Sequence, residues 1–153
     1  MIDTVVLTMQ NADKIIWEPD RFSPSLRDVR QKVSQSFGAR LFTKYTYNIP
    51  AKHGYFPRLT VNPRWQNGIQ IPLRIEFSVP KLLFGNNVDE LGQNDWETVI
   101  ATLKSKLSQM GVKVFSAQLE NALVSAVHFS KNIVLSPHYT ASIALKTLGK
   151  VDV

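Results

Sequence analysis

The stretch "LRIEFSVPKLLFGNN", Leu73 to Asn87, decides the fold class, because its first seven residues alternate between apolar and polar side chains. Successive side chains of a strand point to opposite faces of the sheet. The apolar set is Leu73, Ile75, Phe77 and Val79, and the polar set is Arg74, Glu76 and Ser78. The pattern therefore predicts a half-buried strand whose polar face carries one carboxylate, that of Glu76.

The segment before Glu76 is strongly basic. Its last 47 residues, Val29 to Ile75, contain no acid, and the eight basic residues between Asp28 and Glu76 give a local charge of +8, more than the +6 of the whole chain. Aromatic residues are interleaved with these cations, a mixture that suits phosphates and unpaired bases. Aromatic residues in strands are nevertheless usually core, and scattered Lys and Arg usually form a solvated face. Composition alone leaves both interpretations open.

We predict that a nucleic acid, DNA in particular, is the partner of this basic stretch. The residues expected to contact it are Arg40, Lys44, Tyr47, Lys52, Arg58, Arg64, Trp65, Arg74 and Lys81.

Length and composition predict one globular domain, residues 1–153. The absence of cysteine excludes disulfides and thiolate metal sites and fits a reducing compartment. The N-terminus carries an acid, Asp3, where a signal peptide has basic residues, and no apolar run approaches the roughly 18 residues that span a bilayer. We expect a cytoplasmic protein with no membrane partner.

The middle of the chain is rich in predicted strands. Period-two patterns occur in "RLFTKYTYNI", "YFPRLTVNPRW" and "IQIPLRIEFSVP", and Asn67-Gly68 is a strong hairpin signal. The frequent prolines suit edge strands and bulges, which favours an irregular antiparallel sheet. Ile2 to Met9 is a further predicted strand, and "KIIWEP" is a short extended piece.

Helices are predicted on both sides of this region. In "RFSPSLRDVRQKVSQSFG", Leu26, Val29 and Val33 recur at helical spacing. "WETVIATLKSKLSQMG" has one apolar face and ends at Gly111, and "HYTASIALKTLG" is a second amphipathic segment near the C-terminus. "VKVFSA" and "NALVSAVHFSKNIVL" read as extended. The expected fold is α+β, a mainly antiparallel sheet covered on one face by the Trp96 to Met110 helix and the C-terminal helix.

A metal site is the main chemical hypothesis, since the common nucleotide-binding, hydrolase and zinc-protease signatures are missing. Glu76 and His128 each lie on a predicted strand whose same-face neighbours are small or polar, and Mg²⁺ or Mn²⁺ accepts a carboxylate and an imidazole. Two ligands do not complete a site. The alternative is that Glu76 pairs with Arg74 or a lysine and that His128, like most single histidines on strands, is a hydrogen-bonded structural residue.

Several short pieces of the chain resemble the N-terminal region of the filamentous-phage gene II replication protein family, whose relatives also occur on plasmids. These are "MIDTVVL" with its Ile-Asp, the E-x-x-x-P-K run from Glu76 to Lys81 followed by Gly-Asn-Asn, and "LVSAVHFSKNI" with His128. The resemblance covers most of the chain and is weakest between Trp17 and Trp65.

The resemblance implies the N-terminal domain of a longer protein that binds origin DNA and starts rolling-circle replication. Such proteins nick one strand with a metal ion and a tyrosine, so the resemblance implies that Glu76 is a metal ligand on the DNA side of the sheet and that His128 is its partner from the adjacent strand. The chain departs from the usual pair of histidines around one apolar residue, since Phe129 and Ser130 follow His128.

The catalytic residue stays unknown at this stage, because the nucleophilic tyrosine of this family is expected beyond Val153. The alternative is a non-catalytic DNA- or RNA-binding module with a basic, aromatic sheet face. A protein-interaction domain whose basic stretch meets an acidic partner is a third reading.

Overall fold

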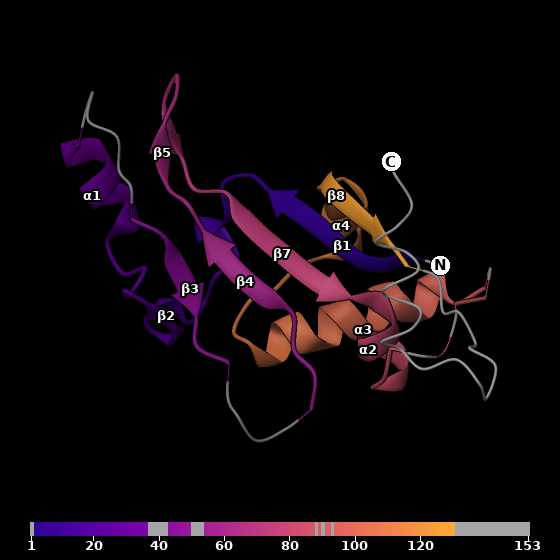
Figure 1. Cartoon of the computed structure of the whole chain (residues 1–153). Helices are drawn as coiled ribbons and strands as arrows, with labels where there is room; N and C mark the ends of the chain where they lie inside the picture. Colours follow the sequence, from indigo (N-terminus) through magenta and orange to yellow (C-terminus); the bar gives the residue numbers. More distant parts are fainter. Residues whose placement is uncertain are drawn as a thin grey trace, which may run out of the picture.

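The computed structural model describes residues 2–36, 43–49, 54–87, 89, 91–92 and 94–130. Its centre is a six-stranded antiparallel sheet (Figure 1). The strands are β1 (Ile2–Met9), β2 (Phe22–Ser23), β3 (Tyr45–Tyr47), β4 (Arg58–Val61), β7 (Leu73–Ser78) and β8 (Leu123–Phe129), in the order β2-β3-β4-β7-β1-β8. β5 (Arg64–Trp65) and β6 (Ile69–Gln70) form a separate two-stranded hairpin.

Four α-helices are described: α1 (Val29–Gln35), α2 (Val79–Phe84), α3 (Trp96–Gln109) and α4 (Ser116–Glu120). Two 3₁₀ turns, Ala12–Lys14 and Pro19–Arg21, lie between β1 and β2. The predicted α+β class is confirmed, and the strongest predicted helix is present as α3. The second predicted covering helix, in the C-terminal segment, lies outside the described residues.

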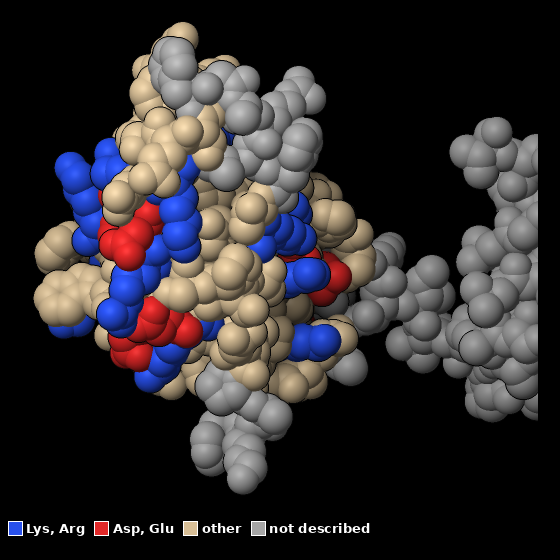
Figure 2. Space-filling model, turned by 90° about the vertical axis from the view of Figure 1, so that its left-hand side faces the viewer, with Lys and Arg blue, Asp and Glu red and all other residues tan. Residues whose placement is uncertain are grey.

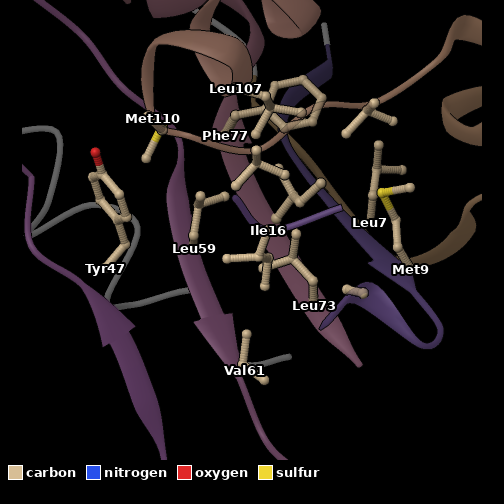
Figure 3. Packing of buried hydrophobic residues seen from close by; sticks show 14 of the residues in the cluster. Leu7, Met9, Ile16, Tyr47, Leu59, Val61, Leu73, Phe77, Leu107 and Met110 are labelled. Carbon is tan, nitrogen blue, oxygen red and sulfur yellow. The ribbon is translucent and has the colours of Figure 1, made fainter. Parts of the chain in front are cut away.

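The hydrophobic core lies between one face of the sheet and the helical layer. α3 buries Val99, Leu103 and Leu107 completely, and α2 adds Val79 and Leu82 to the same cluster. Figure 3 shows strand residues such as Leu59 and Phe77 on the side of the sheet where Leu107 and Met110 lie. The other sheet face is therefore the one left to polar residues, as the alternation in β7 predicts.

The chain between β4 and β7 is one long hairpin whose outer part leaves the sheet. β4 pairs with β7, and β5 pairs with β6 farther along the same hairpin, which extends past the sheet as an arm (Figure 1). The turn has positive φ at Asn67 (50°) and Gly68 (123°), as a tight Asn-Gly turn requires. The predicted hairpin at this dipeptide is confirmed.

Two predicted extended segments are extended only in part. In "KIIWEP" only Ile16 makes a β-bridge, to Val112, because the residues before it close a 3₁₀ turn in which the amide of Ile15 donates to the carbonyl of Ala12. "VKVFSA" ends in α4, whose first turn is held by the Gln118 side chain accepting from the Phe115 amide (2.9 Å). The two segments pair with each other only around the Ile16–Val112 bridge, where the Trp17 amide donates to the Gly111 carbonyl (2.7 Å) and the Lys113 amide donates to the Ile15 carbonyl (2.9 Å).

The described helices include none that is long and apolar enough to cross a membrane.

Candidate nucleic-acid interface

The sheet face opposite the helices presents three rows of mostly polar side chains, because directly paired residues of antiparallel strands share a face. We call it the polar face. The rows are Arg58–Glu76–Val6–Ala126, Thr60–Arg74–Thr8–Leu123, and Ser78–Thr4–His128, and within them Val6 and Thr60 are buried. A register shift in β8 brings the Ser125 hydroxyl within 2.6 Å of that of Thr8. Every strand of the central part of the sheet thus contributes hydrogen-bonding groups to this face.

Arg74 and Glu76 form an ion pair on the polar face. The Arg74 guanidinium donates to the Glu76 carboxylate at 3.2 Å, and the two side chains are 50% and 37% exposed. An ion pair this exposed contributes about 0 to 1 kcal/mol, so it is readily exchanged for another partner. Arg58 lies directly opposite Glu76 on β4 and is exposed. One arginine is therefore bound to the carboxylate, and a second occupies the position across from it on the neighbouring strand.

The β5–β6 arm carries a cation and an aromatic ring beyond the polar face. The Nε of Arg64 donates to the Gln70 side chain (2.8 Å), and the Gln70 amide donates to the Gln66 carbonyl (3.2 Å), which stiffens the hairpin. Trp65 is 40% exposed. A polar hollow of about 380 Å³ lies beside the arm. It is lined by Gln10, Asn11, Arg64, Gln66, Asn67 and Gln70.

The predicted nucleic-acid residues separate into four groups. Arg58 and Arg74 lie on the polar face, and Arg64 and Trp65 lie on the arm. Lys44, just before β3, and Lys81, on α2, are exposed at other places. Arg40 and Lys52 lie outside the described residues.

Tyr47 is not part of a binding surface, which corrects its predicted role. It is only 3% exposed, its ring meets that of Phe22 edge-on at 5.4 Å, and its hydroxyl accepts a hydrogen bond from Arg21 (3.0 Å). The alternation of "KYTYN" allows either face, and β3 turns Tyr45 and Tyr47 toward the core because Tyr45 is paired with buried Val61.

The local charge of +8 is partly neutralised by acids from outside the basic stretch. Arg30, on α1, is bound to Asp13 at 2.8 Å, although 17 residues separate them. Figure 2 shows Lys and Arg interleaved with Asp and Glu over one side of the molecule. The cations form no single continuous basic surface there, and the binding hypothesis rests on the particular residues of the polar face and arm.

The predicted metal pair is not formed by adjacent strands, which corrects that expectation. Glu76 is on β7 and His128 on β8, and β1 lies between them. Both residues are on the polar face, but His128 is level with Ser78, two residues beyond Glu76. Strand spacings of about 4.8 Å and a rise of about 3.3 Å per residue put their Cβ atoms about 12 Å apart.

That separation exceeds the roughly 4.5 to 8 Å between side chains on directly paired strands. Glu76 is also engaged by Arg74. Among the described residues no group of three or more His, Cys, Asp or Glu side chains is arranged to hold a metal ion. Glu76 and His128 as they lie do not fit a shared Mg²⁺ or Mn²⁺.

The structure adds two residues near Glu76 that sequence patterns did not single out as site residues. The Tyr55 hydroxyl accepts a hydrogen bond from the Ser78 amide (2.5 Å), and the Ser78 hydroxyl donates to the Asp3 carboxylate (3.5 Å). Burial raises the pKa of Tyr55, and the charges of Glu76 and Asp3 raise it further. Two carboxylates therefore lie near one phenol at the Ser78 end of β7, where Tyr55 packs against the core. Asp3 could have been found from the sequence, because it belongs to the "MIDTVVL" piece of the family resemblance, whereas no motif pointed to Tyr55 as a site residue.

The fold and this surface together define a domain with an antiparallel sheet, a mostly polar sheet face that carries two arginines, and a protruding arm. Comparisons with protein-family models, curated proteins and solved structures find no match for the chain.

Proposed function

We propose that the chain binds single-stranded DNA along the polar face and the β5–β6 arm. The observation that carries the proposal is that Arg58, Arg64, Trp65 and Arg74 belong to one continuous hairpin, residues 58–78. Guanidinium groups bind phosphates, and an exposed indole stacks on an unpaired base, which favours a single strand over a closed duplex. Arg64 lies six residue steps after Arg58, a span of at most about 20 Å in extended chain.

The resemblance to gene II replication proteins gives this binding a biological setting. We infer that the domain holds the origin strand when rolling-circle replication begins. The exchangeable Arg74–Glu76 pair supports this role, because an arriving phosphate competes with the Glu76 carboxylate for the same guanidinium.

Metal-dependent strand nicking in the cytoplasm is the second candidate function. It is favoured by the carboxylates of Glu76 and Asp3, which lie near the Tyr55 hydroxyl. Because the described side chains do not form a ligand set for Mg²⁺ or Mn²⁺, we assign no catalytic step to them. Calorimetry with MnCl₂ tests this candidate. Binding that Glu76→Gln abolishes supports it, and the absence of heat in the unaltered chain speaks for the binding module alone.

The DNA-binding proposal is tested by fluorescence anisotropy with a labelled thymidine 20-mer between 50 and 200 mM KCl. Each phosphate contact to a single strand contributes about 0.7 to the slope of log affinity against log salt. The double variant Arg58→Gln/Arg64→Gln should therefore bind more weakly and lower the slope by about 1.4. Trp65→Ala should lower affinity by about 1 to 3 kcal/mol while changing the slope little.

Arg27→Gln is the matched control. Arg27 is exposed and pairs with Asp20, as Arg74 pairs with Glu76, but it lies on neither the polar face nor the arm. The affinity of Arg27→Gln for the thymidine 20-mer should stay within twofold of that of the unaltered chain. Unchanged affinity in the Arg58/Arg64 double variant and in Trp65→Ala, with thermal melts that show intact folds, would place any DNA site elsewhere.

A further inference from the structure

A second surface lies on the helical layer, away from the polar face. A hollow of about 260 Å³ opens between the second half of α3 and the segment that leads into α4. We call it the α3–α4 hollow. It is lined by Lys104, Ser108, Lys113, Val114 and Phe115. Its wall is mostly apolar, and its charged side chains are the two lysines.

Phe115 is placed at this hollow without serving the core. Its side chain is 74% exposed, whereas its neighbour Val114 is buried. The backbone at Phe115 is fixed by the hydrogen bond from its amide to Gln118 (2.9 Å), so the ring projects from an ordered helix start. Trp17, which packs against Lys113, is 63% exposed. Clusters of large exposed apolar side chains are typical of interaction sites.

The two lysines are held in place by neutral partners. The Lys113 ammonium lies 3.7 Å from the centroid of the Trp17 ring, and the Lys104 ammonium donates to the Ser116 hydroxyl at 3.1 Å. Within the described part of the chain, neither lysine has a carboxylate within 4 Å. Glu97 and Glu120 line a neighbouring hollow that shares Lys104, but no acid lines the α3–α4 hollow itself. Two ordered positive charges therefore border an apolar wall.

We infer that the α3–α4 hollow binds a short acidic peptide segment of a partner protein, one that carries a large apolar side chain among its carboxylates. The apolar side chain packs in the hollow against Phe115, and the carboxylates lie on Lys104 and Lys113. Charge complementarity selects this occupant, because the apolar wall disfavours a hydrated phosphate backbone and the cations are lysines, which lack the bidentate fork of arginine.

The location of the hollow supports a recruiting role. α3 packs its buried side against the core face of the sheet, so the hollow and the polar face lie on opposite layers. A partner bound at the hollow leaves the polar face free, and the two sites can be occupied together. The contact area is small, so we expect a transient complex with a dissociation constant of about 10 to 100 µM.

The experiment is fluorescence anisotropy with a fluorescein-labelled peptide, Gly-Ser-Asp-Asp-Glu-Leu-Phe-Glu-Asp. One control peptide has Ser-Ser in place of Leu-Phe, and a second has Asn and Gln in place of every acid. Phe115→Ala should weaken binding at least tenfold, and Lys104→Gln and Lys113→Gln about threefold each. Lys104→Gln removes the positive charge but keeps a donor for the Ser116 hydroxyl, so this variant tests the effect of the charge. Lys32→Gln, which replaces an exposed lysine of α1, is the matched control, and its peptide affinity should stay within twofold of that of the unaltered chain.

Three results would overturn the inference. The first is no saturable binding tighter than about 1 mM. The second is equal binding of the peptide without Leu-Phe, or unchanged binding in both lysine variants. The third is displacement of the peptide by a thymidine 20-mer together with weaker DNA binding in Phe115→Ala, which would assign the hollow to the nucleic-acid surface. DNA binding by these variants is measured in parallel, so failure of the peptide site is distinguishable from failure of the DNA-binding proposal.

Discussion

Glu76→Gln is the variant that best separates DNA binding from metal binding on the polar face. The substitution keeps the size of the side chain and removes the charge that engages Arg74. If a phosphate binds Arg74 at about 3 Å, it lies about 6 Å from the Glu76 carboxylate, because the carboxylate and the guanidinium are 3.2 Å apart. Both side chains are more than a third exposed, so the dielectric constant of water applies to this repulsion.

At that distance the repulsion is about 0.7 kcal/mol. Glu76→Gln should therefore raise the affinity for a thymidine 20-mer about threefold at low salt. The salt dependence should stay the same, since Arg74 makes its phosphate contact in both chains. Anisotropy titrations between 50 and 200 mM KCl measure the affinity and its salt dependence. Glu120→Gln, which removes an exposed acid of α4, should leave the affinity unchanged.

A different outcome would refute the reasoning. Equal or weaker DNA binding by Glu76→Gln, with an intact thermal melt, would mean that no phosphate reaches Arg74. Loss of manganese binding in the same variant would instead give Glu76 the role of a metal ligand.

Two further predictions concern stability. Gly111→Ala should lower the free energy of unfolding by about 2 kcal/mol or more in urea titrations, because φ is +75° and an added Cβ would lie 2.6 Å from the Cβ of Glu18. Gly85→Ala is the control, since Gly85 has a similar φ (+72°) but open space around it, and it should cost only about 1 kcal/mol. Equal losses would refute the clash. Tyr55→Phe should cost about 1 kcal/mol by leaving the Ser78 amide without its acceptor. The raised pKa of Tyr55 means that the folded chain holds the phenol proton more tightly than the unfolded chain does. The resulting stabilisation is complete below about pH 10 and is lost as the pH rises above that value. Unfolding curves of Tyr55→Phe should lack this loss of stability at high pH.

Periodicity was sufficient for the elements that are specified locally. The alternation of β7 identified its polar face, Asn67-Gly68 identified the arm, and the apolar face of the Trp96 to Met110 segment identified α3. These features depend on residues that are neighbours in sequence or lie one turn apart. Such interactions are already specified before any distant strand is paired.

The candidate site depended on strand order, which periodicity does not contain. Glu76 and His128 share a face, as their parities allow, but the insertion of β1 between β7 and β8 separates them. The burial of Tyr47 and the pairing of Arg30 with Asp13 likewise follow from contacts between distant segments.

The sequence by itself determined which residues alternate, which turn reverses the chain and where the positive charge is concentrated. Only the tertiary structure decided which charges are neutralised, which rings are buried and which strands are neighbours. The physical reason is that a strand can satisfy its hydrogen bonds with any compatible edge. The choice among edges is made by the burial of the whole core, to which β1 adds Val5, Leu7 and Met9 beside the apolar side chains of β7.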